Sequence, residues 1–225
     1  MTVVGADACK NGWIAVALRD DAPAGAHYLE TIELLSSVVP DVQVVAIDIP
    51  IGLPTTGFRA ADLEAKRFLR HKHAAVFSVP CRSVLEAQTH AEATALSVEL
   101  SGVGISRQAY SLGPKIFEVE RWIPTAPCGV YELHPEVSFT VLMGGLPTAS
   151  KKTWAGSIQR REALARQGIS LDHVTGLAAT QAAVDDMLDA GVAAWTARRI
   201  LEGRARSFPA PPELDGTGRR VAIWA

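Results

Sequence analysis

Residues 44–50 read Val44-Val45-Ala46-Ile47-Asp48-Ile49-Pro50, an apolar and largely β-branched run that holds one carboxylate. Such a run is typical of a strand that is buried on both faces of a sheet. We place the strand at residues 42–49 and expect the following prolines to end it. A carboxylate in this setting is costly to bury unless it is paired or binds a cation. The run therefore predicts a covered central strand and marks Asp48 as a candidate site residue.

The flanking sequence adds the other elements of an α/β fold. The Asn11-Gly12 turn predicts a hairpin, and apolar residues at helical spacing predict helices later in the chain. We expect a mixed sheet of about five strands with helices on both faces. The whole chain, residues 1–225, is then one domain with a helical insertion around 55–125. The expected strands are 2–6, 13–18, 27–34, 42–49, 129–133 and 221–224. The expected helices are 60–69, 90–100, 107–123 with an interruption near Gly113-Pro114, 154–167 and 180–202. The expected irregular segments or loops are 19–26, 71–88 and 207–218.

Composition narrows the class of protein. The chain has 225 residues, of which 48% are hydrophobic and 20% charged, with a net charge of -2. This composition excludes a disordered chain, and it excludes a protein that holds long duplexes by charge alone. Three widely spaced cysteines, no visible signal peptide and no apolar run of about 18 residues predict a cytoplasmic protein without a membrane segment.

Two further groups of acids join Asp48. Asp7 ends the first predicted strand, and Asp185, Asp186 and Asp189 share one face of an apolar, alanine-rich helix. Close carboxylates repel one another, and a hard divalent cation relieves that repulsion. Each position also has a simpler interpretation: Asp7 caps a turn, Asp48 accepts hydrogen bonds from a loop, and the helix acids form a solvated face.

Six other polar residues are candidates for substrate contacts. Lys115, Lys151 and Lys152 are suited to holding phosphates, although exposed lysines are common. Glu132, His134 and Glu136 surround the end of the strand at 129–133. His134 can shuttle a proton or simply precede the helix that begins at Pro135. Glu136 can equally stabilise the start of that helix.

Four runs resemble a known family: GADACKNGW at 5–13, AIDIPIGLP at 46–54, ELHPEVSF at 132–139 and VDDMLDAGVAAWTAR at 184–198. They are similar to the domain-of-unknown-function family 429, described as predicted ribonuclease H-like nucleases. The resemblance implies a ribonuclease H-like fold in which the first and fourth strands are adjacent. Asp7 and Asp48 would then lie side by side, and the closing helix would bring Asp186 and Asp189 to them as catalytic residues.

The same resemblance implies metal-dependent hydrolysis of phosphodiesters in nucleic acid. The five acids, Asp185 included, would bind one or two Mg²⁺ or Mn²⁺ ions, which lie about 3.5–4 Å apart in two-metal sites. Because the chain is not basic, we expect a short or structured nucleic acid as partner.

Two other functions stay open. An actin-like or sugar-kinase-type phosphotransferase has a similar sheet and an acid after its first strand, but it needs a second glycine-rich phosphate loop, and Gly102-Val103-Gly104 is a weak candidate. A non-catalytic binding domain of the same fold is the third possibility.

Overall fold

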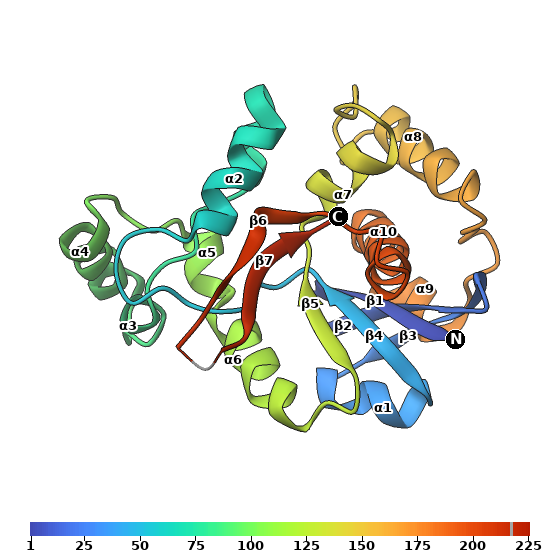
Figure 1. The fold of residues 1–225 in the computed structure, drawn as a ribbon, viewed down its shortest axis with the longest axis horizontal. Coiled ribbons are helices and arrows are strands. Elements are labelled where there is room, and N and C mark those ends of the chain that lie inside the picture. The colour runs from blue at the N-terminus through green and yellow to red at the C-terminus, as the bar shows by residue number, and fades with distance from the viewer. Residues whose placement is uncertain (217) are drawn as a thin grey trace.

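A mixed five-stranded sheet forms the centre of the molecule (Figure 1). The computed structural model describes residues 1–216 and 218–225. The strand order is β3-β2-β1-β4-β5, in which β1 to β3 are antiparallel and β4 and β5 run parallel to β1. The expected adjacency of the first and fourth strands is thus confirmed, and the sheet is consistent with a ribonuclease H-like fold. The strands are β1 (Thr2–Cys9), β2 (Gly12–Arg19), β3 (Ala22–Leu29), β4 (Val42–Ile47) and β5 (Gly129–Glu132).

Helices cover both faces of this sheet, as the sequence predicted. Alternate residues of a strand point to opposite faces, so Val4 and Ala6 pack on one side while Val3 packs on the other. The first side is covered by α6 (Gly113–Trp122), η1 (Ile32–Leu34) and α1 (Leu35–Val38). The second is covered by α10 (Val184–Leu201), with α7 (Pro135–Leu142) and α8 (Trp154–Ala165) beside it.

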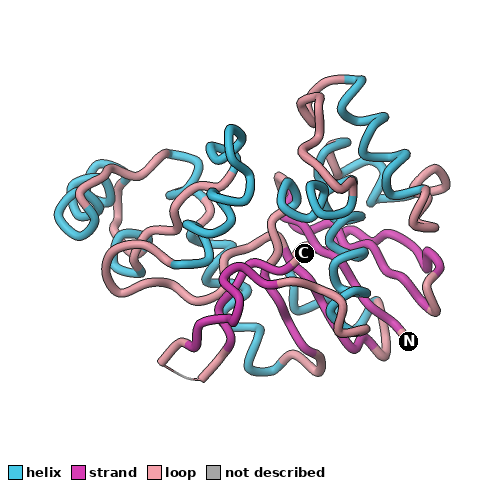
Figure 2. Tube along the Cα trace, turned by 45° about the horizontal axis from the view of Figure 1, so that its top comes forward, coloured by secondary structure: helices cyan, strands magenta, loops and turns pink. Residues whose placement is uncertain are grey.

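The chain between β4 and β5 is largely helical, and within it α2 (Ala60–Leu69) and α4 (His90–Ser101) lie to one side of the sheet (Figure 1). Figure 2 shows the same arrangement turned by 45°, with helices in cyan and strands in magenta. A second, two-stranded sheet pairs β6 (Ser207–Leu214) with β7 (Arg220–Trp224), and α2 packs against it through Ala61, Leu69 and Phe208. In the described part of the chain, no helix is both long and apolar enough to cross a membrane. The remaining helices are α2 (Ala60–Leu69), η2 (Arg70–Ala75), α3 (Arg82–Leu85), α4 (His90–Ser101), α5 (Arg107–Ser111), η3 (Ile123–Thr125) and α9 (Gly176–Gln181).

Gly5 allows α10 to lie unusually close to β1. A Cβ atom at this position would come within 1.9 Å of the backbone nitrogen of Ala194 and 2.3 Å of the carbonyl oxygen of Ala190. The helix presents small residues here, so the two backbones approach without intervening side chains. Asp7 follows Gly5 by two residues and therefore faces the same helix.

Four expected segments differ from the structure, and one of them is 71–88, where we expected irregular chain and the structure has η2 (Arg70–Ala75) and α3 (Arg82–Leu85). The third strand is 22–29, not 27–34, because Asp20 and Asp21 adopt φ angles of 47° and 67° and make a tight turn where we expected a loop. The helix expected over 180–202 is divided into α9 and α10 at residues 182–183. The loop expected at 207–218 is mostly β6. This strand tolerates its prolines because, among the described residues, it pairs with β7 alone and its register shifts between Phe208 and Glu213. Residue 217 lies outside the described residues.

Candidate functional site

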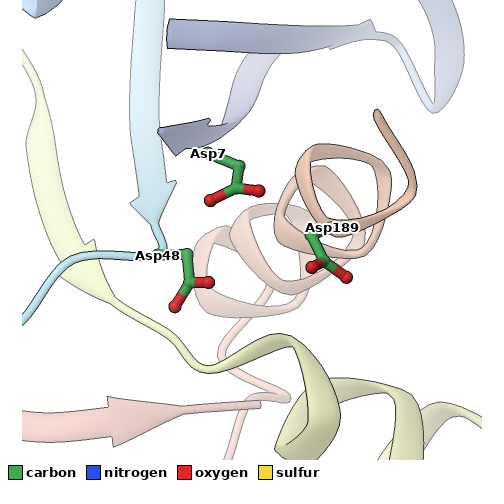
Figure 3. Close-up of side chains that lie close together, drawn as sticks. All are labelled: Asp7, Asp48 and Asp189. Carbon is green, nitrogen blue, oxygen red and sulfur yellow. The ribbon is translucent and has the colours of Figure 1, made fainter. Parts of the chain in front are cut away.

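Three carboxylates meet where β1, β4 and α10 come together (Figure 3). One oxygen each of Asp7, Asp48 and Asp189 lies within 4.8 Å of the others. The backbone nitrogen of Asp48 donates to the carbonyl oxygen of Ala6 at 3.0 Å, which extends the β1–β4 ladder and sets the two strand acids side by side. The close approach of α10 at Gly5 then brings Asp189 against both of them.

These carboxylates have few protein partners. Lys151 Nζ donates to Asp189 Oδ2 at 2.5 Å, while Asp189 Oδ1 is buried and has no hydrogen-bond partner. Among the described residues, none donates a hydrogen bond to the carboxylate of Asp7 or Asp48. The structure therefore shows neither a turn capped by Asp7 nor a loop held by Asp48. Buried acceptors that lack donors are rare and call for an explanation such as a bound ion.

Burial and mutual repulsion disfavour the charged form of all three acids. Burial, followed by the charges of Asp48 and Asp189, raises the pKa of Asp7 well above its ordinary value. Burial and the charge of Asp189 raise the pKa of Asp48 in the same way. Burial raises the pKa of Asp189 to about 6, although Lys151 opposes that shift. A cation between these oxygens would favour their charged forms.

The cluster opens into a cavity of about 690 Å³ that reaches from α10 to α2 and the loop before α8. Among the described residues, eight carboxyl groups and five lysine or arginine side chains line it, so its walls carry an excess of negative charge. Asp185 and Asp186 are part of the lining, outside the three-carboxylate cluster. Asp185 lies 4.0 Å from Lys151 Nζ, and Asp186 accepts a hydrogen bond from the Ala183 backbone at the start of α10.

Glu132 is part of a buried network of ion pairs. Arg59 contacts Glu132 Oε1 at 2.7 Å and Asp62 Oδ1 at 2.5 Å, and all three residues are at least 95% buried. The Ile51 backbone donates to Glu132 Oε2 at 2.7 Å, and the Val79 backbone donates to Asp62 Oδ2 at 2.8 Å. Glu132 thus ties β5 to the segment between β4 and α2, and its oxygens are engaged by the protein rather than offered to a substrate.

Glu136 is part of a second network of ion pairs. Arg160 contacts Glu136 Oε2 at 2.7 Å, and Lys72 contacts Oε1 at 3.0 Å. Burial alone would raise the pKa of Glu136, but the hydrogen bonds from Arg160 and Lys72 hold it below its ordinary value. Glu136 therefore links α7, α8 and η2 across the cavity wall as a paired anion.

The other candidates divide between the cavity and the opposite face of the sheet. Lys151 and Lys152 line the cavity. Lys115 instead pairs with Glu118 at 3.0 Å and lies over the Trp13 ring, so its expected contact with substrate phosphates has no support in its position. His134 lines the cavity, and its Nε2 lies 3.1 Å from the carbonyl oxygen of Ala75. Burial lowers the pKa of His134 to about 4, so the ring is neutral at pH 7.

Sequence reasoning missed several residues at or near this cavity. No local pattern distinguishes four of them from ordinary charged residues, because their roles depend on distant partners. These four are Arg59, Asp62, Lys72 and Arg160. Trp154 is different, because it directly follows the lysine pair at 151–152 and a helix N-cap threonine, a juxtaposition visible in the sequence.

Comparisons with known proteins place the chain in a family. Neither curated proteins nor solved structures give a match. The model of the family described as "Protein of unknown function (DUF429)" matches residues 5–214, which is most of the chain and includes every residue of the three-carboxylate cluster. The chain belongs to the DUF429 family.

Proposed function

We propose that Asp7, Asp48 and Asp189 bind Mg²⁺ or Mn²⁺ and that the protein hydrolyses phosphodiester bonds in nucleic acid. The observation that carries this proposal is the meeting of three carboxylates within 4.8 Å, with one buried oxygen of Asp189 left without a donor. Hard divalent cations prefer such oxygen ligands. Asp185 and Asp186 lie on the same cavity wall and can hold metal-bound waters or a second ion.

Each group in the cavity then has a part in the reaction. A divalent cation supplies Lewis acidity and lowers the pKa of water that it binds. The three carboxylates would hold that cation at the strand ends, where Asp7 and Asp48 would also accept hydrogen bonds from an attacking water. Lys151 and Lys152 line the same cavity and neutralise the phosphate beside the acids. His134, neutral at pH 7, can accept a hydrogen bond at Nδ1, which is buried and has no partner among the described residues.

Charge also limits the partner. The chain carries a net charge of -2, so attraction between the whole protein and a polyanion is weak. A short or structured nucleic acid that enters the cavity needs only the local lysines. The three cysteines are free thiols, which suits a reducing compartment, and we propose a cytoplasmic location.

The test is cleavage of a labelled panel of single strands, duplexes, DNA–RNA hybrids and branched junctions with 5 mM Mg²⁺ or Mn²⁺, concentrations of roughly the scale at which weak carboxylate sites fill. We expect cleavage of some member by the wild type and none by Asp7→Asn or Asp189→Asn. Asp41→Asn is the matched control, because Asp41 is exposed and lies outside the cavity. Failure to cut any substrate, combined with metal binding, would leave a non-catalytic metal-binding domain.

A further inference from the structure

Trp154 is the most exposed large apolar side chain that the structure describes, at 77%. The indole of a tryptophan gains much from burial, and tryptophan is enriched at binding interfaces. Three of the other four tryptophans are core residues, with exposures of 0% for Trp13, 3% for Trp122 and 4% for Trp195. Trp154 therefore presents a large aromatic surface to solvent where a ligand or partner can reach it.

The backbone beneath this side chain is firmly held. Thr153 caps α8, and its hydroxyl accepts from the Gly156 backbone at 3.1 Å. The Thr153 backbone also donates to the carbonyl oxygen of Ser150 at 3.0 Å, which closes a tight turn. Gly156 is packed so closely on Ser150 that a Cβ atom would come within 1.9 Å of its carbonyl oxygen. The ring is thus attached to a fixed point and costs little conformational entropy to use.

The same turn leads directly into the candidate site. Ser150, Lys151 and Lys152 all line the cavity, and the Lys151 ammonium reaches Asp189. Lys152 is exposed. Trp154 follows this pair on the first turn of α8, so an aromatic surface lies two residues beyond a lysine pair that lines the cavity, and Lys152 is the exposed member of that pair. Aromatic rings interleaved with basic side chains are what binds single-stranded nucleic acid, because bases stack on the rings and cations hold the phosphates.

We propose that Trp154 is a stacking platform for an unpaired base of the substrate, which makes the substrate class single-stranded nucleic acid or a single-stranded end. This inference rests on the proposed function and specifies its substrate. The cavity volume of about 690 Å³ is of the size that accommodates small ligands, hence one or two nucleotides. In a duplex both faces of an internal base are covered by its neighbours, so only an unpaired or terminal base can meet the ring.

Binding without metal tests this proposal separately from catalysis. A fluorescein-labelled 12-residue single strand of mixed sequence is titrated by anisotropy in EDTA at low salt, where metal-dependent cleavage cannot occur. We expect Trp154→Ala to weaken binding about 5- to 150-fold, the usual effect of losing one stacked base. Trp154→Phe keeps an aromatic face and should stay near the wild type. Leu177→Ala is the matched control, because Leu177 is an apolar side chain of 62% exposure on α9, a helix that packs against β3.

Two further measurements complete the test. Tryptophan emission should be quenched when unlabelled single strand binds the wild type, and this quenching should largely disappear in Trp154→Phe. A relaxed, covalently closed circular duplex, which has no unpaired or terminal base, should bind the wild type and Trp154→Ala equally. Equal affinity of Trp154→Ala and wild type for the single strand, no measurable binding by the wild type, or an equal loss with duplex would overturn the proposal. None of these outcomes depends on whether the metal-loaded protein cleaves.

Discussion

Replacing Asp48 by asparagine should stabilise the metal-free protein. At a separation of 4.8 Å and an effective dielectric constant of about 20, each repulsion between two ionised acids of the cluster costs roughly 3 kcal/mol. Asp48→Asn removes two such repulsions and one attraction to Lys151, and protonation of the remaining acids reduces the gain further. We expect a net gain of about 1–3 kcal/mol in unfolding free energy, or roughly 2–10 °C in melting temperature for a chain of this length.

The assay is thermal unfolding in EDTA and again with excess Mn²⁺. A ligand that binds only the folded state at 100 times its dissociation constant adds about 2.7 kcal/mol of stability. The wild type should therefore gain more stability from Mn²⁺ than Asp48→Asn does. The difference between the two melting temperatures should then shrink or change sign. Asp41→Asn removes an exposed charge and should behave like the wild type in both buffers. A fall of several degrees for Asp48→Asn in EDTA would show that repulsion does not dominate and would identify Asp48 as a structural hydrogen-bond acceptor.

Three further predictions concern the surroundings of the cluster. Gly5→Ala should destabilise the fold by about 1–3 kcal/mol or more in urea unfolding, because its Cβ collides with the α10 backbone. Gly145→Ala should be nearly neutral, because a Cβ at Gly145 meets open space. Equal stability of the two variants would contradict the close approach of α10 to β1. Arg59→Met should cost about 3–5 kcal/mol, since it leaves two buried carboxylates unpaired, and a neutral result would show that the ion network is not formed. The raised pKa of Asp189 means that the folded state holds the proton of this carboxyl more tightly than the unfolded chain does. In EDTA the wild type should therefore lose stability relative to Asp189→Asn as the pH rises from about 4 through about 6. Parallel profiles of stability against pH for the two proteins would contradict this.

The family resemblance, rather than a local pattern, predicted that Asp7 and Asp48 lie side by side, and the pairing of β1 with β4 confirms it. The apolar runs by themselves predicted only that each carboxylate stands at the end of a buried strand. Asp189 could be anticipated because it interrupts an alanine-rich, buried helix. Asp185 and Asp186 could not be separated from Asp189 in this way, because burial along α10 rises over the first turn, and only the structure shows that Asp189 alone reaches the strand ends.

Long-range partners explain most of what the sequence did not reveal. The role of Glu132 depends on Arg59, 73 residues away, and that of Glu136 depends on Arg160 and Lys72. No periodicity records such pairings. The β6 strand was missed for a different reason: its prolines oppose a central strand, and they are tolerated here because β6 has one neighbour and an interrupted register.

Isothermal titration of Mn²⁺ into the metal-free protein at pH 7.5, about 1.5 pH units above the raised pKa of Asp189, measures whether the three carboxylates bind a cation. We expect saturable binding of one or two ions to the wild type, at least tenfold weaker binding to Asp7→Asn and Asp189→Asn, and unchanged binding to the exposed-acid control Asp41→Asn. Heats that do not saturate in the wild type, or equal affinity in all four proteins, would contradict this expectation.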